Sequence, residues 1–352
     1  MRRLSVHQRL LFLDSEATTM IRFGIISFAH MHANDYARAV NVINETTGNA
    51  SLVAVSDDNQ SRGKSKCVDF GVANFFANYE DMLAGDVVDA VIIASENSKH
   101  LEQVIAAVRA GKHIICEKPI TVSNEAINEM QNALKRSEKR IFFQTAFPMR
   151  YDATVAEAKR TLDSGTLGAI KAISATNHGT FPGGWFADKN LSGGGAVIDH
   201  TVHVADLVRF FTADEFESVR AFKGINLHAG VDVEDNALLY ARMKNSHAPV
   251  SIDCSWSRME GWPIWGDVKV ELVCEKGVLK IDCCNPHLDL VSGSKFSWHS
   301  MTEDLNLKMI SGFCRHVEAG LEPTASFQDG AAAASLAFAA YKSLEGNETV
   351  LV

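Results

Sequence analysis

The stretch Gly111-Lys112-His113-Ile114-Ile115-Cys116-Glu117-Lys118-Pro119 decides how the first half of the chain folds. Residues 114–116 form a short apolar run, which is typical of a strand buried on both faces of a parallel sheet. Pro119 has no N–H group to donate to a sheet ladder, so the strand is expected to end at Glu117 and Lys118. Ligands bind at the carboxyl ends of strands in open α/β sheets, and the sequence therefore predicts a lysine at a ligand-binding edge.

Strand and helix patterns alternate on both sides of this stretch. Apolar strand-like runs and segments with helical spacing of apolar residues follow one another from residue 21 to residue 146. This order is typical of a doubly wound parallel sheet, the Rossmann type of dinucleotide-binding domain. Besides the stretch above, the predicted strands are residues 21–27, 52–57, 88–95 and 141–145, and the predicted helices are residues 33–44, 101–110 and 124–137.

The turn after the first strand departs from the usual dinucleotide-binding motif. In the G-x-G-x-x-G frame the chain has Ser27, Ala29 and His32 instead of glycines. Serine and alanine are the smallest substitutes, so a pyrophosphate can still approach the amino end of the next helix. His32 is predicted either to face cofactor or substrate as a donor, or to cap or pack the helix.

The second predicted strand ends in Asp57, at the position where this fold reads the adenosine ribose. A carboxylate there accepts hydrogen bonds from the ribose hydroxyls and repels a 2′-phosphate. Asp58 adds negative charge, whereas Arg62 could meet a phosphate. We therefore predict NAD as the cofactor, with NADP as the alternative. The alternative interpretation of Asp57 involves no cofactor: the residue lies in a solvated turn after the strand.

The second half of the chain has a different pattern. After a predicted helix at residues 153–162, strand-like segments follow without intervening helices, and residues 250–257 alternate apolar and polar side chains. This alternation indicates a sheet with one buried face. We predict an α+β domain over residues 147–352 with an open-faced, mostly antiparallel sheet, whose other face forms an oligomer interface. The predicted strands are residues 168–178, 217–228, 233–243, 248–257, 267–275 and 278–284, and an alanine-rich helix at residues 331–344 is expected to pack back against the body.

Gly193-Gly194-Gly195 leads into a second group of candidate residues. The glycines allow the backbone to approach a ligand, and the helix that they begin carries positive partial charge at its amino end. On that helix Asp199 and His203 are four residues apart and share a face, with Asp206 three residues further on. A histidine titrates near neutrality and a carboxylate can orient it, so the pair suits proton transfer. The alternatives are a surface ion pair, or a metal site with His200, for which the sequence shows no further ligand cluster.

Residues between the two groups are candidate substrate contacts. Residues 181–186, Phe-Pro-Gly-Gly-Trp-Phe, could supply an aromatic wall for a ring or form a rigid loop at the domain junction. His178 lies at the end of a predicted strand before that loop. Arg150 and Tyr151 follow the expected domain boundary, where they either contact a ligand or fix the hinge.

Composition narrows the classes of function. The 352 residues carry a formal net charge of −9 and the sequence pI is ≈ 5.8, which argues against a surface for nucleic acid or anionic membranes. No apolar run in the sequence approaches the length of a membrane span. The seven cysteines lack a C-x-x-C pair, which favours reduced thiols in a cytoplasmic protein over a redox role for Cys283-Cys284.

Residues 1–20 are expected to lie outside the folded domains. Arg2-Arg3 is not followed by the apolar stretch of an export signal, because Leu10-Leu11-Phe12-Leu13 gives way at once to Asp14. We predict an extension that is disordered or upstream of the functional start. Met20 is the predicted initiator, since the first strand follows it directly.

The two groups of residues together resemble the glucose-fructose oxidoreductase and inositol dehydrogenase family (Gfo/Idh/MocA). The resemblance covers about residues 21–352 and rests on Glu117-Lys118-Pro119, on the glycine-rich segment leading to Asp199-x-x-x-His203, and on a Rossmann domain followed by an open sheet. It implies a nicotinamide cofactor, sugar or polyol substrates, and dimers or tetramers formed through the open sheet. It also implies Lys118, Asp199 and His203 as the catalytic set.

The resemblance also implies which side chains contact the cofactor and which contact the substrate. Family members often have a glycine where Thr201 stands, and together with the unusual turn at residues 27–32 this departure indicates a distinct subgroup. The expected cofactor contacts are Ser27, Phe28, Ala29, His32, Asp57, Arg62, Ser95, Asn97, His100, Glu117 and Lys118. The expected substrate contacts are Lys118, Arg150, His178, Trp185, Asp199, His200 and His203, and no metal is expected.

The activity expected from the resemblance is reversible hydride transfer between a nicotinamide cofactor and a secondary hydroxyl of a sugar or polyol. In the oxidation direction His203 removes the hydroxyl proton, Lys118 stabilises the developing alkoxide, and Asp199 binds a neighbouring hydroxyl or orients the base. Glu117 is expected to support the loop. Two alternatives are a redox-neutral glycoside hydrolase that returns the hydride, and a non-catalytic nucleotide-binding regulator, against which the intact catalytic set argues.

Overall fold

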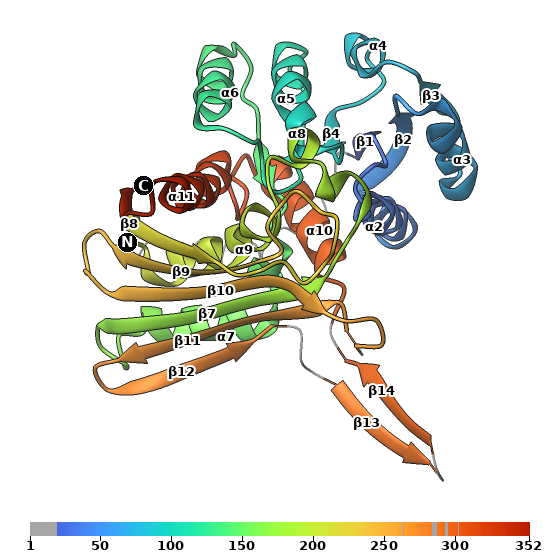
Figure 1. The fold of residues 1–352 in the computed structure, drawn as a ribbon. Helices are drawn as coiled ribbons and strands as arrows, with labels where there is room; N and C mark the ends of the chain where they lie inside the picture. Colours follow the sequence, from blue (N-terminus) through green and yellow to red (C-terminus); the bar gives the residue numbers. More distant parts are fainter. Residues whose placement is uncertain (1–19, 263, 284–286, 293–294, 302) are drawn as a thin grey trace, which may run out of the picture.

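The computed structural model describes residues 20–262, 264–283, 287–292, 295–301 and 303–352. The extension predicted at residues 1–20 therefore lies outside the described residues, except for Met20. Within the described residues the chain builds one sheet from its first half and a second, larger sheet from its second half (Figure 1).

The first sheet has six parallel strands in the order β3-β2-β1-β4-β5-β6. This order confirms the predicted Rossmann sheet, and the strand order reverses between β1 and β4, where such folds bind dinucleotides. The strands are β1 (Ile21–Ile26), β2 (Ala50–Ser56), β3 (Asn74–Phe76), β4 (Ala90–Ile93), β5 (His113–Cys116) and β6 (Phe143–Thr145).

Helices cover both faces of this sheet, so its central strands are apolar throughout. The sequence did not predict α3, α4 or β3. The reason is local: α3 buries only Gly63 and Cys67, and α4 and β3 are too short to show a period. The helical elements of this half are α2 (Ala33–Thr46), α3 (Gln60–Phe70), α4 (Tyr79–Ala84), η1 (Asn97–Lys99), α5 (His100–Arg109) and α6 (Asn124–Arg136).

The second sheet has seven strands in the order β12-β11-β7-β10-β9-β8-β15. Its ladders are antiparallel except for the parallel pair of β7 and β10, which confirms the predicted mostly antiparallel sheet. The strands are β7 (Ile170–Thr180), β8 (Phe216–Lys223), β9 (Asn236–Met243), β10 (Pro249–Arg258), β11 (Gly266–Cys274), β12 (Gly277–Asp282) and β15 (Val350–Leu351).

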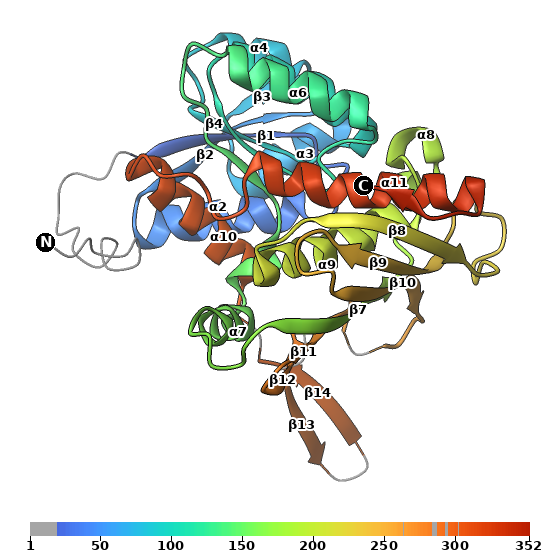
Figure 2. The same ribbon diagram turned by 90° about the vertical axis from the view of Figure 1, so that its left-hand side faces the viewer.

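The predicted strands of this half are wrong at one connection. Residues 224–228 and 233–235 belong to the loop between β8 and β9, because the buried Asp235 carboxylate accepts the backbone N–H groups of Leu227 at 2.7 Å and His228 at 2.8 Å. A hairpin of β13 (His287–Ser292) and β14 (Lys295–Ser300), which the sequence did not predict, projects from the body in both views (Figures 1 and 2).

Only one face of the second sheet is covered within the described residues. α9 (Ala196–Thr212) packs against β7, β9, β10 and β11, and nearly all of its residues, polar ones included, are buried because neighbours surround it. Side chains on the other face are exposed, including Leu238 at 57% and Tyr240 at 58%, whereas the intervening Leu239 is 2% exposed. The alternation read from the sequence thus corresponds to a sheet with one open face.

Three helices from the second half of the chain pack around the two sheets, and α11 contacts elements of both. α11 (Phe327–Gly346) packs against α9 and β8 on one side and against β6 and α6 on the other (Figure 2). α10 (Leu305–Glu318) packs on α2, and it buries Ile310 and Phe313 in the core of the first sheet, although it lies in the second half of the sequence. α7 (Ala153–Asp163) contacts β12.

Arg150 fixes the connection between the two halves. It lies on η2 (Pro148–Tyr151), directly after the domain boundary expected at residue 146. Its guanidinium donates to Asp206 at 2.6 and 2.8 Å and to the carbonyl of Thr324 at 2.6 Å, and it lies 3.0 Å from Asp329. Every nitrogen of this buried guanidinium is therefore engaged at the hinge, which matches the second of the two roles predicted for Arg150.

No helix of the described residues is long and apolar enough to span a membrane. Buried free thiols, as predicted for most of the cysteines, are found at Cys67, Cys116, Cys254, Cys274 and Cys314. Cys284 lies outside the described residues.

Candidate active site

Lys118 and Asp199 meet where the two halves of the chain join. Lys118 follows β5, and its ammonium donates to Asp199 Oδ1 at 2.5 Å and to the Asp199 carbonyl at 3.3 Å. Both side chains are buried, with exposed fractions of 4% and 9%. Charges removed from water persist only when they are paired and hydrogen-bonded, so this ion pair links the end of the first sheet firmly to α9.

Two side chains from distant segments fix the amino end of α9. Glu234 Oε1 accepts the backbone N–H groups of Gly195 and Val197, both at 3.0 Å, and Tyr341 donates to the same oxygen at 2.8 Å. A carboxylate at this position also complements the helix dipole. A Cβ atom on Gly194 would lie 1.9 Å from Tyr341 Oη, and one on Gly195 would lie 1.8 Å from the Glu234 carbonyl oxygen. The glycines therefore admit Glu234 and Tyr341, and not a ligand as the sequence suggested.

Asp199 is an ionised acceptor held by two donors. Trp256 Nε1 donates to Asp199 Oδ2 at 2.9 Å, while Lys118 occupies Oδ1. Burial would raise the pKa of Asp199, but the charge of Lys118 and these hydrogen bonds hold the pKa well below its usual range. The carboxylate is therefore negatively charged at neutral pH.

His203 is a neutral imidazole one turn along α9 from Asp199. Burial, assisted by the nearby charge of Lys118, lowers the pKa of His203 well below its usual value. Its ring packs against Phe147, with centroids 6.0 Å apart, and its Nδ1 has no hydrogen-bond partner among the described residues. An unprotonated imidazole beside a lysine is suited to accept a proton.

His200 lies behind the Asp199 carboxylate. Its Nδ1 is 3.0 Å from the carbonyl of Asn177 and its Nε2 is 3.4 Å from Asp199 Oδ2. The side chain is fully buried, and burial lowers its pKa. The structure thus places His200 against the carboxylate, so that a contact with substrate would pass through Asp199.

Ser27 and Ala29 form the turn where a dinucleotide fold usually has glycines. Ser27 has φ +70°, a left-handed conformation that favours glycine, and it is stabilised by the hydrogen bond from Ala29 N–H to its own Oγ at 3.1 Å. The conformation of the motif is therefore present without the glycine. Phe28 N–H, within the same turn, donates to Asp57 Oδ2 at 2.9 Å.

Asp57 organises this turn from the end of β2. It is 1% exposed, and Arg62 donates to its two oxygens at 2.8 and 2.9 Å. Asp58 is much more accessible, with a side chain 61% exposed that accepts a hydrogen bond from Lys99 at 2.6 Å. Arg62 and Lys99, the two basic side chains described here, are thus each paired with an acid. Of the two carboxylates, that of Asp58 is the one accessible to solvent.

A cavity of ≈ 210 Å³ lies at the carboxyl ends of β1, β2 and β4. Hydroxyl and carboxylate groups dominate its polar lining, which suits the hydroxyls of a ribose, and the surplus of acids disfavours a 2′-phosphate. The residues around this cavity therefore fit the adenosine end of NAD. The polar lining comes from Ser27, Ser56, Asp57, Asp58, Asn78, Tyr79, Ser95, Lys99 and Gln103.

Glu117 stabilises the turn at residues 27–32, called the cofactor turn, through hydrogen bonds. Its carboxylate accepts hydrogen bonds from Tyr36 O–H, from His32 Nδ1 at 2.9 Å, and from Lys118 N–H at 3.0 Å. His30 Nδ1 accepts the backbone N–H of His32 at 3.2 Å. The ligand atoms of His30, His32 and Glu117 lie within 4.8 Å of one another, which could hold a metal ion, although the hydrogen bonds described here already engage them.

Asn97 and His100 join loops of the site together. Asn97 Nδ2 donates to the Ser192 carbonyl at 2.8 Å, across the domain junction, and its Oδ1 has no partner among the described residues. His100 is fully buried between the carbonyls of Ser95 at 3.2 Å and Pro119 at 3.0 Å. His100 therefore lies in the interior next to the cofactor-binding edge, and its hydrogen bonds fix the loop that carries Lys118.

The aromatic segment at residues 181–186 closes over the cofactor turn. Trp185 Nε1 donates to the carbonyl of Ala29 at 3.1 Å, and its ring stacks on Phe186 with centroids 3.9 Å apart. The His30 ring lies 5.4 Å from that of Phe186. These contacts tie the segment to the cofactor turn, and they support the rigid-loop interpretation more directly than that of an aromatic wall.

His178 lies apart from this group. It is on β7 and faces the open side of the sheet, whereas a Cβ atom on the next residue, Gly179, would meet the ring of His200 on α9. Its ring nitrogens lie 3.0 Å from Asp267 and 3.2 Å from Asp253. The sequence prediction of a substrate contact at His178 is not supported, because a strand reverses the facing of its side chains at every residue.

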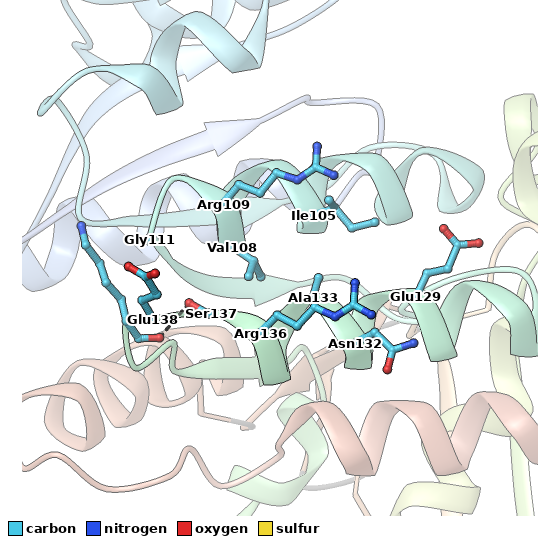
Figure 3. Close-up of a pocket in the computed structure, with 11 residues that line it drawn as sticks. Ile105, Val108, Arg109, Gly111, Glu129, Asn132, Ala133, Arg136, Ser137 and Glu138 are labelled. Carbon is cyan, nitrogen blue, oxygen red and sulfur yellow. Dashed lines mark hydrogen bonds between the residues drawn. The ribbon is translucent and has the colours of Figure 1, made fainter.

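A cavity of ≈ 610 Å³ lies outside the predicted site (Figure 3). It is a surface hollow between the carboxyl ends of α5 and α6, at the opposite edge of the sheet from Lys118. Its lining includes Arg109, Glu129, Arg136 and Glu138.

A buried lysine–aspartate pair thus lies beside the edge of a sheet whose strand order is that of dinucleotide-binding Rossmann domains. The model of the oxidoreductase family with an NAD-binding Rossmann fold (GFO_IDH_MocA) matches residues 21–145, and that of the GFO/IDH/MocA C-terminal domain matches residues 155–280. The chain belongs to the Gfo/Idh/MocA family, and its first domain binds NAD.

Relatives match this chain over most of its length. Myo-inositol 2-dehydrogenase of Thermotoga maritima is 27% identical over 94% of this chain and 98% of its own length, and glucose-6-phosphate 3-dehydrogenase of Bacillus subtilis is 30% identical over 76% of each. Among solved structures, a probable dehydrogenase from Thermotoga maritima has a TM-score of 0.79 at 26% identity, covering 94% of this chain and 99% of that one. A scyllo-inositol dehydrogenase from Lactobacillus casei, with NAD(H) and scyllo-inositol bound, shares the fold with a TM-score of 0.80 at 22% identity, covering 95% and 99%.

Sequence reasoning missed four side chains that build the site. Four side chains, each 39 to 146 positions away from the predicted residue that it contacts, hold that residue or its backbone: Tyr36, Glu234, Trp256 and Tyr341. Only the tyrosine on α2 had a signal, as an apolar residue at helical spacing. The other three show no pattern in the sequence that distinguishes them from core residues.

The ion-pair cluster of His178 predicts a specific pH dependence of stability. Hydrogen bonds with Asp253 and Asp267 raise the pKa of His178 to about 9, above its ordinary value of about 6.5. A raised folded-state pKa stabilises the protein in full below about pH 6.5, and this stabilisation is lost as the pH rises through about 9.

We therefore expect the difference in Tm between the wild-type protein and His178→Gln to be largest near pH 6 and to shrink toward pH 9.5. Thermal unfolding followed by circular dichroism at fixed protein concentration measures it. His247→Asn is the control, because His247 is exposed at φ +57°, which asparagine tolerates. A difference that stays constant across this range would contradict the assignment.

Proposed function

We propose that this protein oxidises a secondary hydroxyl of a sugar or polyol, or reduces the corresponding ketone, with NAD as the hydride carrier. The observation that carries the proposal is the buried group of Lys118, Asp199 and His203 beside the nucleotide-binding edge. It combines a cation, an anion and a neutral base within one site. The named relatives, which are inositol and sugar dehydrogenases, support the substrate class.

His203 is the general base in the oxidation direction. Because its imidazole is neutral, it can accept the hydroxyl proton as the O–H bond breaks. NAD, when bound, accepts the hydride from the same carbon. In the reverse direction the protonated imidazole returns the proton to the carbonyl oxygen.

Lys118 stabilises the negative charge that develops on the substrate oxygen. In a buried site such a positioned cation is worth far more than in water, since little solvent screens it. Asp199 holds the ammonium in place before the substrate arrives. The proposed role of Asp199 is therefore to position Lys118, besides any contact with a neighbouring hydroxyl.

The proposed cofactor contacts divide into two kinds. Ser27, Ala29 and Asp58 would hold the cofactor, and the exposed Asp58 carboxylate could accept hydrogen bonds from ribose hydroxyls. Arg62 and Asp57 act as a pair that shapes the turn, and the contact between Glu117 and His32 supports it. This arrangement favours NAD over NADP because no unpaired cation among the described residues lines the ≈ 210 Å³ cavity.

Lys118→Ala tests the central assignment. We expect kcat to fall by about a hundredfold or more, because the alkoxide loses its positioned cation, while the Kd of NAD measured by fluorescence quenching changes little. The assay is NADH absorbance with inositols, pyranoses and sugar acids as substrates. Lys112→Ala, on the opposite edge of the sheet, is the control. Unchanged turnover in Lys118→Ala would remove the lysine from the mechanism.

The open face of the second sheet is proposed as the contact between subunits of a homodimer or homotetramer. Large apolar side chains stand exposed on β8, β9, β11 and β12, at Phe222, Leu238, Tyr240, Val273 and Val278. Several large apolar side chains exposed on one face of a sheet are typical of an interface.

Tyr240→Glu is expected to disrupt this assembly. A charge placed on the centre of the face opposes its burial, so the mass measured by size-exclusion chromatography with light scattering should fall to that of one 38.4 kDa chain. Val68→Glu, at an exposed apolar residue of α3, is the control. If Tyr240→Glu retains the mass of the wild-type protein, assembly through this face is wrong.

A further inference from the structure

Three groups face the carboxylate of Asp199, and they come from three different elements. Lys118 approaches from the end of β5, His200 from α9 itself, and Trp256 from β10. Lys118 and Trp256 each donate a hydrogen bond to the carboxylate, whereas His200 does not. These groups therefore differ in how well they can keep the carboxylate oriented during turnover.

We propose that Trp256 is a positioning residue: its indole N–H fixes Oδ2 of Asp199, so that Oδ1 remains directed at Lys118. The inference rests on the proposed function, since it concerns the lysine assigned to the alkoxide. Neither the sequence pattern nor the comparisons single out this tryptophan.

The indole is placed independently of the ion pair. Trp256 is fully buried, and its backbone N–H donates to the Asp235 carbonyl at 2.8 Å. Its ring belongs to a small apolar cluster with Phe186, Ala196 and Val233. The donor therefore stays in position whether or not Lys118 contacts Asp199.

His200 cannot take over this role in its neutral form. Its Nδ1 lies 3.0 Å from the carbonyl of Asn177, and in the tautomer with the ring hydrogen on Nδ1 the two form a hydrogen bond. Its Nε2, 3.4 Å from Asp199 Oδ2, then presents a lone pair to a carboxylate, and it has no hydrogen-bond partner among the described residues. Among the described residues, the hydrogen bond to Oδ2 therefore comes from Trp256 and not from His200.

This matters when substrate enters. As Lys118 turns its ammonium toward the developing alkoxide, its bond to Asp199 weakens, and a carboxylate without another donor would rotate away. With Oδ2 held at 2.9 Å by the indole, Oδ1 stays where the ammonium needs a counter-charge. The tryptophan thus acts through Asp199 on Lys118, and it needs no contact with substrate.

Trp256→Phe removes the donor and keeps most of the ring. A hydrogen bond to a charged group contributes enough that we expect kcat to fall roughly tenfold, with the KM for NAD unchanged within about twofold. The acid limb of the kcat profile should move to higher pH, because Asp199 binds a proton more readily without the indole. Trp262→Phe, at a half-exposed tryptophan, is the control. A kcat and a pH profile equal to those of the control would overturn the proposal.

A second measurement does not depend on turnover. The chain has five tryptophans, so the ¹⁵N-labelled protein gives five indole signals, and Trp256→Phe identifies one of them by its loss. We expect this signal to be shifted downfield, and Asp199→Asn to move it upfield more than the other four. An indole signal that does not respond to Asp199→Asn would overturn the contact. If no variant and no substrate shows turnover, the proposed function fails, and this signal still decides whether Trp256 holds Asp199.

Discussion

The buried ion pair of Lys118 and Asp199 is the interaction on which the rest of the site depends. Each partner comes from a different half of the chain, and each would be costly to bury alone. Lys118 must follow closely after β5, Asp199 must lie in the first turn of α9, and the two halves of the chain must keep a fixed distance. The hinge at Arg150, the glycine segment packed on Tyr341 and Glu234, and the indole of Trp256 all meet these requirements.

The surroundings of this pair explain its chemistry. The histidines near it, His30, His200 and His203, are buried, and burial lowers the pKa of each. They are therefore neutral, so none of these three adds a charge next to the pair of Lys118 and Asp199. A neutral imidazole next to a paired lysine can take up a proton without adding a second unpaired charge to the interior. A neutral imidazole to accept the proton, next to a lysine that carries the positive charge, fits the removal of a proton and a hydride from one alcohol.

The sequence predicted the features that are local or periodic. The order of strands and helices, the strand end at Glu117-Lys118 and the helix after Gly195 are correct, because apolar periodicity, proline and glycine act over a few residues. It did not predict that His178 faces away from the site, since the register of β7 depends on its neighbours. The roles of Glu234, Tyr341 and Trp256 were also out of reach, because they follow from packing between segments more than 30 residues apart. For Arg150, the sequence left two roles open, and the contacts with Asp206 favour the hinge.

A crystal structure of the complex with NAD and a bound polyol tests the central claim most directly. The account predicts that the reacting hydroxyl lies within hydrogen-bond distance of Lys118 Nζ and of a ring nitrogen of His203, with Asp199 still bound by Trp256. A polyol bound elsewhere, with Lys118 and Asp199 unchanged and inaccessible behind it, would contradict the account.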